Sequence, residues 1–444
     1  MPPAVATLRS DQMPTRSDKP SFSIVGGRLA AGGGILTLMA DMGRALALDP
    51  GMRMLGGGNP APVPEVQTLV RARMEQLLRD GVAFDRMMVN YDPPRGNPRF
   101  LAALADLLRR EYGWNVGPDN LAITSGGQSA FFFLFNLLGG EFDGGRQRKI
   151  LLPLCPEYIG YADQALGTEL FVACRPAIET GHEGDARCFK YRIDFTAVEQ
   201  ALAAHDVGAI AVSRPTNPSG NVLTDAEVER LATLAAAQGI PLIVDNAYGA
   251  PFPDILFVPA RPFWAEHVIL TMSLSKLGLP GTRTGIVVAP EPIAAAVAGM
   301  TAIVGLANGT IGQQIALPWV EDGSILRIGR DHLRPFYAAK AMAATAWARE
   351  SLDAAGVDWA LHAQEGAFFH WLWLPGLAIP TLELYERLKA RHVLTVPGEH
   401  FFFGLDDDWP HRHQCLRLNV SGAAETVRDA YRIIADEALR ATTA

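Results

Sequence analysis

Cysteine is scarce in this chain of 444 residues: four occur, and no two of them form a CxxC pair. So few thiols in a chain of this length exclude a disulfide framework and the paired ligands of a structural zinc site. No apolar run reaches the ~18 residues that a membrane span needs, and residues 1–20 lack the apolar core of a secretory signal. We therefore expect a cytoplasmic protein with reduced thiols and a flexible N-terminal tail over residues 1–21.

Positive charge is also limited, because 39 Lys and Arg residues face 47 Asp and Glu residues. The resulting net charge of -8 argues against nucleic acid or an anionic membrane as a partner. Hydrophobic residues make up 49% of the chain, which is enough for a large buried core in two or three domains. Lysine is rare among the basic residues, so a lysine inside a motif is seldom there by chance; the six are Lys19, Lys149, Lys190, Lys276, Lys340 and Lys389.

From about residue 120, short apolar runs alternate with longer helical patterns. A capping box at Thr224 and Glu227 opens one helix, which runs to Gln238 before Gly239 ends it. Strands interleaved with helices predict an α/β fold with a mostly parallel sheet between helices. After about residue 305, a helical stretch at 324–354 and several short strands predict a smaller α+β domain. The predicted strands of the large sheet are 121–124, 149–153, 209–213, 241–245, 268–272 and 285–289.

The most informative local pattern is Ser273-Leu-Ser275-Lys276, which follows a predicted buried strand. A turn containing Pro280 and Gly281 comes next, and Arg283 follows it. An isolated lysine at the end of a strand is usually a surface side chain. Here, however, hydroxyl groups flank the lysine, and three other predicted strands also end in polar motifs.

These three motifs are Pro-Thr-Asn217-Pro after the strand that ends at Ser213, Asp245 at the end of an apolar strand, and the Gly-rich turn at 125–129. Each is weak alone, because NPxG is a common turn and an Asp often caps a helix. The amides of the Gly-rich turn can hold a phosphate at the start of a helix. Because the carboxyl ends of parallel strands meet at one edge of a sheet, we expect all four motifs to share one crevice.

The expected crevice combines an amine nucleophile, a carboxylate, a phosphate cradle and a cation. This combination suits pyridoxal 5′-phosphate: Lys276 would form a Schiff base, and Asp245 would keep the pyridine nitrogen protonated so that the ring acts as an electron sink. A dinucleotide cofactor has no support, because no GxGxxG sequence occurs. The residues therefore predict an enzyme that depends on pyridoxal phosphate.

At these positions the chain resembles the fold-type I (class I/II) aminotransferases, in particular the bacterial valine–pyruvate type. The resemblance runs through nearly the whole chain after about residue 22, and it implies a large cofactor-binding domain at 65–305 and a small domain from 22–64 and 306–444. It implies transamination between a small aliphatic L-amino acid and a 2-oxo acid, with L-valine and pyruvate as the expected pair. The stretches that carry the resemblance are 55–60, 157–163, 213–218, 245–249, 273–281 and 396–398.

The resemblance also implies roles for single residues around the cofactor. Lys276 would bond to it covalently and then move a proton at the substrate. Asp245 would pair with the pyridine nitrogen, and Tyr158 would stack on the ring. Tyr248 and Asn217 would donate to the 3′ oxygen. The predicted phosphate ligands are Ser273, Ser275 and Arg283, with the amides of Gly127 and Gln128.

For the substrate, the resemblance implies that Arg417 binds the α-carboxylate, where the planar guanidinium favours bidentate contact. Gly58 would lie where the N-terminal segment closes over that carboxylate, and Asn217 would also contact the substrate. Tyr91 would reach the phosphate of a partner subunit, which implies a homodimer with shared active sites. The apolar segment 34–40 would cover the substrate and favour aliphatic side chains.

One residue departs from the pattern of the family. Relatives usually carry a hydroxyl side chain in the phosphate turn where this chain has Gly127. We expect backbone amides to replace one side-chain contact there, at a modest cost in cofactor affinity. The Gly-rich segment 32–34 is either a hinge for a lid helix or only a helix start.

Several alternatives stay open at this point. Ser273 and Lys276 also match the SxxK of serine acyl-enzymes, although the KTG and SDN elements of that class are absent. An aminotransferase-like regulator needs an N-terminal DNA-binding module, for which about 65 residues leave no room. A lyase or decarboxylase would use the same lysine. His411 and His413 lack the partner pattern of a metal site, so we expect no metal. The aromatic segment 368–373 is expected to lie in the hydrophobic core and not in the pocket.

Overall fold

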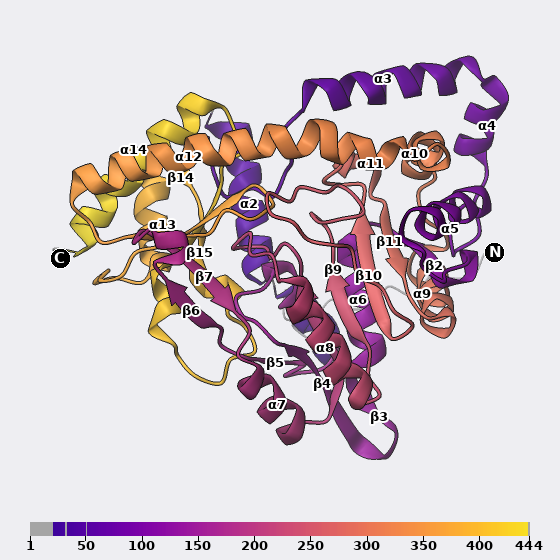
Figure 1. Cartoon of the computed structure of the whole chain (residues 1–444), viewed down its shortest axis with the longest axis horizontal. Helices are drawn as coiled ribbons and strands as arrows, with labels where there is room; N and C mark the ends of the chain where they lie inside the picture. Colours follow the sequence, from indigo (N-terminus) through magenta and orange to yellow (C-terminus); the bar gives the residue numbers. More distant parts are fainter. Residues whose placement is uncertain (1–20, 32, 50, 443–444) are drawn as a thin grey trace, which may run out of the picture.

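The computed structural model describes residues 21–31, 33–49 and 51–442, and Figure 1 labels most of its helices and strands. Eight strands form the large sheet in the order β2-β11-β10-β9-β8-β4-β3, with β5 paired to β4. The pairs from β10 through β9, β8 and β4 to β5 are parallel, whereas β11 is antiparallel to both of its neighbours. The predicted mostly parallel sheet is confirmed. The strands are β2 (Leu121–Thr124), β3 (Gly140–Phe142), β4 (Arg146–Leu152), β5 (Phe171–Ala173), β8 (Val207–Ser213), β9 (Leu242–Asp245), β10 (Val268–Ser273) and β11 (Gly285–Val288).

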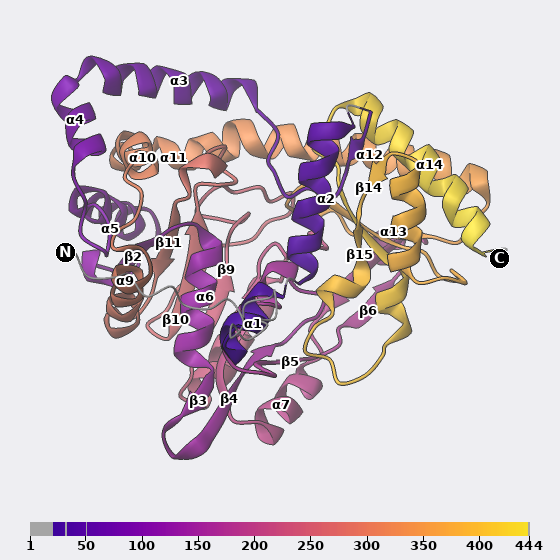
Figure 2. The same ribbon diagram turned by 180° about the vertical axis from the view of Figure 1, so that it is seen from behind.

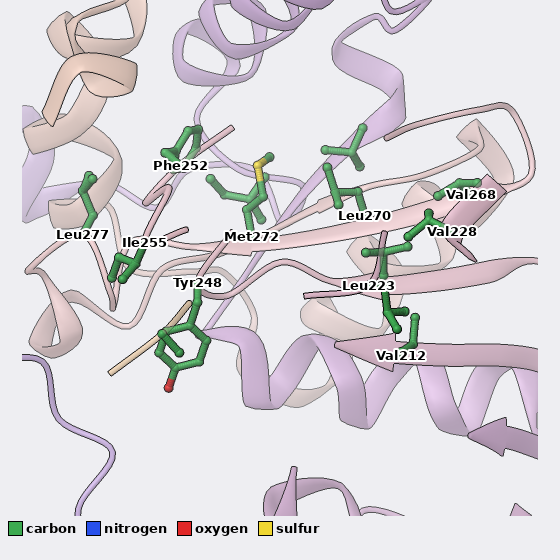
Figure 3. Close-up of a cluster of buried hydrophobic side chains, with 14 of the residues drawn as sticks. Val212, Leu223, Val228, Tyr248, Phe252, Ile255, Val268, Leu270, Met272 and Leu277 are labelled. Carbon is green, nitrogen blue, oxygen red and sulfur yellow. The ribbon is translucent and has the colours of Figure 1, made fainter. Parts of the chain in front are cut away.

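Helices cover both faces of this sheet, which is why its central strands are almost continuous apolar runs. Helix α6 (Gly127–Leu138) packs its aromatic side chains on one face. On the other face, Val228 of α8 (Asp225–Ala237) belongs to the same buried cluster as Val212 of β8 and Leu270 of β10 (Figure 3). The sheet is therefore the middle layer of a helix–sheet–helix sandwich.

The start of α8 confirms the predicted capping box. Thr224 Oγ1 accepts a hydrogen bond from the Glu227 amide at 3.2 Å, and the Glu227 carboxylate accepts one from the Thr224 amide at 2.8 Å. The two side chains satisfy amides that the first turn of a helix leaves without partners. This cap fixes where the chain enters α8 after it has left the end of β8.

The second sheet has six strands, in the order β15-β16-β13-β12-β7-β6. Strands β6 and β7 lie within 65–305, so this sheet takes two strands from the region that we assigned to the large domain. Strand β1 (Arg53–Met54) pairs with β14 (Val393–Leu394), which joins the N-terminal segment to the C-terminal region. The division of the chain into domains stays a prediction. The strands are β6 (Ala177–Thr180), β7 (Cys188–Arg192), β12 (Ala360–His362), β13 (Phe369–Trp373), β15 (Val396–Pro397) and β16 (Cys415–Asn419).

The helix expected at 324–354 is interrupted. It consists of α11 (Ser324–Arg327), a π-helical segment at 328–333 and α12 (Arg334–Ala355). Pro335 has no N–H to donate to the preceding turn, and the hydrogen-bonding pattern changes directly before it. Gly329 also passes close to the chain, since a Cβ there would lie 2.2 Å from the carbonyl oxygen of Pro253. The periodicity predicted the length of the helical stretch but not its break.

The helices of the N-terminal segment take two different places. Helix α2 (Gly34–Leu48) lies where the two sheets meet, whereas α3 (Pro64–Arg79) and α4 (Gly81–Val89) follow the periphery (Figures 1 and 2). Within the described ranges, no helix has the length and apolar character needed to cross a membrane. The remaining helices are α1 (Ile24–Ala30), α5 (Pro98–Tyr112), α7 (Phe195–Ala204), α9 (Glu291–Gly305), α10 (Ile311–Glu321), α13 (Thr381–Ala390) and α14 (Ala424–Thr442).

Candidate active site

The carboxyl ends of β2, β8, β9 and β10 lie at one edge of the large sheet, as predicted. The register aligns Ser213 with Asp245, Asp245 with Thr271, and Ser273 with Thr124 through one residue of β11. A cavity of 480 Å³ opens at this edge. Every residue predicted for the site except Tyr91 lines it, namely Gly58, Gly127, Gln128, Tyr158, Asn217, Asp245, Tyr248, Ser273, Ser275, Lys276, Arg283 and Arg417.

Lys276 is partly buried inside this cavity rather than exposed at the surface. Its Nζ donates to the carbonyl oxygen of Gly58 at 2.6 Å and lies 5.4 Å from the centroid of the Tyr248 ring. Burial lowers the pKa of the lysine to about 8, and the nearby cations Arg417 and Arg283 contribute in the same direction. The amine therefore loses its proton far more readily than a lysine in water, as a nucleophile requires.

The turn that carries Lys276 is held by its own hydroxyl groups. Ser273 Oγ accepts from the Ser275 amide at 3.0 Å and donates to the Thr284 carbonyl at 3.3 Å. Lys276 Nζ bonds to Gly58 instead of to Ser273. This arrangement does not form the serine–lysine pair of an SxxK acyl-enzyme, so that alternative is not supported.

Asp245 ends β9 with its carboxylate held from several sides. Its oxygens accept from the Ala247 amide at 3.0 Å, from Thr271 Oγ1 at 3.3 Å and from the hydroxyl of Tyr161. Burial raises the pKa of the carboxyl above its ordinary value, while these hydrogen bonds act against that rise. An acid fixed in this way at the cavity wall can bind a protonated ring nitrogen in a defined orientation.

The sequence reasoning missed Tyr161 and Glu157. Tyr161 is buried and its hydroxyl contacts Asp245, whereas Glu157 accepts from the amide and Oγ of Ser213 at 2.7 and 2.6 Å. Burial raises the pKa of Glu157 to about 8. Both residues flank Tyr158 in the stretch 157–163, which carried part of the resemblance. That stretch was the available signal, although no local rule shows that these side chains turn toward β8 and β9.

The Gly-rich turn after β2 fits a phosphate group. Gly126 has φ +89°, and a Cβ there would lie 2.2 Å from Arg283 Nη2, so only glycine lets the guanidinium lie against the turn. Helix α6 begins at Gly127, whose missing Cβ would meet no atom within 4 Å. The first amides of this helix, Arg283 and the hydroxyls of Ser273 and Ser275 therefore surround a space that suits an anion.

Arg417 lies on β16 of the six-stranded sheet and reaches the same cavity. Its Nη1 donates to Asn217 Oδ1 at 3.0 Å and its Nη2 to the carbonyl oxygen of Gly56 at 2.6 Å. The buried Nε has no hydrogen-bond partner within the part of the chain that the structure describes. Burial lowers the pKa of the guanidinium to about 10. A carboxylate ligand would provide the acceptor that this arginine lacks.

The N-terminal segment that we expect to cover the substrate contributes apolar side chains to the cavity wall, and its closure over a substrate stays a prediction. Helix α2 lines the cavity with Ile35, Leu38, Met39 and Met42, whereas residue 32 of the possible hinge lies outside the described residues. The segment 368–373 is buried except for the partly buried Trp373, and its first two rings also pack against Tyr248, with centroids at 5.3 and 5.7 Å. The described residues contain no cluster of His, Cys, Asp and Glu that could hold a metal ion.

Tyr91 is the predicted site residue that the cavity does not include. It follows α4 with 81% of its side chain exposed. The structure therefore gives this residue no role in the cavity of its own chain, and its predicted role in a partner subunit stays a prediction.

Residues 59–434 match the family described as aminotransferase class I and II. The chain belongs to this family. It is 46% identical to valine–pyruvate aminotransferase of Escherichia coli over 95% of this chain and 99% of that protein. The crystal structure of valine–pyruvate aminotransferase from Salmonella typhimurium has a TM-score of 0.83 and 44% identity, over 92% of this chain and 99% of that one. Aspartate aminotransferase of Thermus thermophilus, at 24% identity and a TM-score of 0.73 over 94% and 100% of the two chains, shares the fold.

As a member of this class, the protein is an aminotransferase of fold type I that depends on pyridoxal 5′-phosphate, which confirms the predicted fold class, enzyme class and cofactor. The cofactor supplies an electron sink for negative charge that develops at the α-carbon of the substrate. The cavity fits this group, because a low-pKa lysine, a fixed carboxylate and an anion cradle line one space.

Proposed function

We propose that this aminotransferase transfers the amino group of L-valine to pyruvate, which gives 2-oxoisovalerate and L-alanine. The observation that carries the proposal is the full-length match at 46% identity to a valine–pyruvate aminotransferase. The cavity supports it, because α2 contributes an apolar wall of Ile35, Leu38 and Met39. Contact with such a wall favours an aliphatic side chain, because apolar surface leaves water. A side-chain carboxylate would lose its hydration there and would need a cation or hydrogen-bond donor in return.

The arginines that line the cavity also support this choice of substrate. Among the described lining residues they are Arg283, beside the phosphate cradle, and Arg417. Arg417 binds the α-carboxylate, which valine, alanine and both 2-oxo acids share. We find no further lining arginine in the described chain that would bind the second carboxylate of aspartate or glutamate, so these acids are poor substrates.

Each residue of the site has a distinct task. Lys276 attaches the cofactor and, in its neutral form, moves the α-proton of the substrate, while Gly58 lies beside it. Asp245 holds the ring nitrogen, Tyr158 stacks on the ring, and Tyr248 and Asn217 donate to the 3′ oxygen. Asn217 also holds Arg417 in position through the hydrogen bond between them. The phosphate ligands are the amides of Gly127 and Gln128 and the side chains of Ser273, Ser275 and Arg283.

We further propose a homodimer with shared active sites. Apolar side chains at the end of α4 (Met88 and Val89) and of α9 (Ile303 and Val304) are 55–87% exposed, and Tyr91 lies beside the first pair. Hydrogen bonds from Thr310 Oγ1 to the Met87 carbonyl and from Asn308 to the Pro94 carbonyl join these two regions. Exposed apolar surface next to a site is typical of an interface. A second copy that covers it brings Tyr91 to the neighbouring phosphate cradle.

A cytoplasmic location completes the proposal. Three of the four cysteines are buried, and all four are free. Free thiols that persist without pairing suit a reducing compartment.

The substrate proposal is tested by adding single amino acids to the yellow holoenzyme and following its visible spectrum. L-Valine and L-alanine should convert the pyridoxal form into the pyridoxamine form, and pyruvate and 2-oxoisovalerate should reverse the conversion. L-Aspartate and L-glutamate serve as comparisons and should react at least ~10-fold more slowly. A higher kcat/KM for aspartate or glutamate than for valine would contradict the substrate and leave the aminotransferase class intact.

A further inference from the structure

The chain segment from Gly56 to Asn59 separates two sets of side chains. The Gly56 carbonyl accepts from Arg417 Nη2 at 2.6 Å, and the Gly58 carbonyl accepts from Lys276 Nζ at 2.6 Å. The carbonyls of the other two residues turn the other way. Asn419 Nδ2 donates to the Gly57 carbonyl oxygen at 2.8 Å and to the Asn59 carbonyl oxygen at 3.3 Å. The partners therefore alternate along the segment: the carbonyls of Gly56 and Gly58 face the cations, and those of Gly57 and Asn59 face Asn419.

Asn419 is itself held firmly. It ends β16, two residues after Arg417, with 7% of its surface exposed. Its own amide donates to the Leu55 carbonyl at 2.7 Å, and its Oδ1 accepts from the Ser421 amide at 2.9 Å. The bond from Ser421 assigns the oxygen of the side-chain amide, so the NH₂ group must face the two carbonyls.

We infer that Asn419 is a positioning residue for the substrate-binding arginine. By holding the Gly57 and Asn59 carbonyls, it fixes the rotation of the segment, and the Gly56 carbonyl on the opposite side then orients Arg417. The inference rests on the proposed role of Arg417 in carboxylate binding. The segment cannot be fixed from position 56 itself by a side chain, because a Cβ on Gly56 would lie 2.7 Å from the Thr395 carbonyl oxygen.

The expected effect is on substrate binding more than on turnover. The hydrogen-bond partners of Arg417 are Gly56 and Asn217, so a rotated segment removes one of the bonds that orient its guanidinium. Lys276 depends less on the segment, because hydrogen bonds between Ser273, Ser275 and Thr284 hold its turn. Misplacement of a carboxylate clamp weakens binding by an order of magnitude or more.

The test compares Asn419→Asp with a matched substitution elsewhere. Asn419→Asp keeps the size and the acceptor but replaces the NH₂ donor with an oxygen that faces two carbonyls. Asn120→Asp is the control, because Asn120 has the same arrangement: its Oδ1 accepts from Gly117 at 2.8 Å and its Nδ2 donates to the Ala289 carbonyl at 3.0 Å. Asn120 precedes β2, at the end of that strand away from the site.

In the holoenzyme, Asn419→Asp should raise the KM for L-valine about tenfold while kcat changes less than about threefold. Asn419→Ala, which lacks the added charge, should raise the KM in the same direction by a smaller factor. In the cofactor-free protein, amide hydrogen exchange of residues 55–59 should be faster in both variants. Asn120→Asp should change neither the KM nor the exchange of this segment.

Two results would overturn the inference. The first is an unchanged KM in a folded Asn419→Asp enzyme, and the second is an equal rise of KM in Asn120→Asp. If valine is not the substrate, the same ratio of KM values is measured with whichever amino acid converts the spectrum, so failure of the substrate proposal is recognised separately.

Discussion

Two lysines are removed from bulk water in this protein, and their surroundings are opposite. Lys190 of β7 has a side chain 2% exposed, and its Nζ contacts the Glu365 carboxylate, Asn221 Oδ1 at 3.0 Å and the Val222 carbonyl at 3.3 Å. Lys276 donates to one carbonyl; burial lowers its pKa most, the cations Arg417 and Arg283 add to this, and the Asp245 carboxylate acts in the opposite direction. Lys190 is therefore paired directly with a carboxylate, whereas Lys276, within the described residues, donates to a backbone carbonyl only.

This difference separates a structural charge from a reactive one. A buried ammonium that is ion-paired and hydrogen-bonded ties neighbouring segments together. A lysine whose burial and cationic neighbours disfavour its charge gains neutral amine as the pH approaches 8, at a cost in stability that a purely structural site would not retain. We therefore expect Lys276, at the edge of the large sheet, to take part in the reaction and Lys190 to stabilise the fold.

The largest effect is expected from Lys276→Ala. Loss of the amine that we propose attaches the cofactor and moves the proton should lower kcat by about 10⁴-fold or more. The thermal midpoint of the cofactor-free protein should stay the same or rise, because an unfavourably placed cation is removed. Steady-state rates with L-valine and pyruvate, together with a melting curve, check both parts. A folded variant that keeps a tenth of the activity would contradict the assignment.

Lys190→Met should show the reverse pattern. It leaves the Glu365 carboxylate buried without its cation, which should lower the free energy of unfolding by about 3–5 kcal/mol. The fraction that is folded at 25 °C should keep a kcat near that of the parent enzyme. In the double variant Lys190→Met with Glu365→Leu, part of the stability should return, because neither charge is left alone. Denaturant unfolding of the parent enzyme, Lys190→Met, Glu365→Leu and the double variant measures this, and a double variant as unstable as the sum of the single ones would refute the pairing.

Asp245→Asn probes the carboxylate that complements the reactive edge. The substitution keeps the shape but removes the charge that we propose holds the protonated ring nitrogen, so kcat should fall about 10²- to 10³-fold. Cofactor content should change far less, because the phosphate cradle is untouched. Rates are compared with the absorbance of bound cofactor, and near-normal turnover would remove the electron-sink argument.

Tyr161→Phe tests whether Asp245 depends on the neighbour that the sequence did not reveal. Removal of one hydroxyl from a buried carboxylate should lower kcat about tenfold and leave the fold intact. Phe131 and Phe135 already pack against this ring, with centroids 4.5 and 5.2 Å away, so the phenyl group has a place to remain. Turnover equal to that of the parent enzyme would show that Ala247 and Thr271 suffice.

The smallest effect is a dependence on pH. Because the pKa of Lys276 is lowered from 10.5 to about 8, the neutral amine gains population as the pH rises through 8 and saturates above it. The rate at which added cofactor develops its visible band with the cofactor-free protein should rise about fivefold from pH 7 to pH 8 and level off by about pH 9. A rate that continues to climb toward pH 10.5 would mean that the lysine behaves as a solvent-exposed one.

Much of the reactive edge could be predicted from the sequence, because local signals coincide there with strand ends. The apolar runs that end at Ser213, Asp245 and Ser273 are enough to place three polar residues at one edge of a parallel sheet. The capping box at Thr224 likewise predicted where α8 begins. These features depend on neighbours within a few residues, which is the range over which sequence patterns act.

What could not be predicted depends on contacts between distant parts of the chain. Strand β7 pairs with β12 although more than a hundred residues separate them in the sequence, and no periodicity in the sequence predicts that pairing. The bonds from Tyr161 to Asp245 and from Asn419 to Gly57 are of the same kind. The pairing of Lys190 with Glu365 also spans 175 positions, so the sequence alone did not show that Lys190 is buried and paired.

The most direct test of the contrast between the two lysines is to find which one bears the cofactor. The yellow holoenzyme is reduced with borohydride and digested, and the peptides are analysed by mass spectrometry. The account predicts that the added mass of the reduced cofactor lies on the peptide that contains Lys276, and that the peptide with Lys190 is unmodified. Attachment at Lys190, or at any lysine other than Lys276, would contradict it.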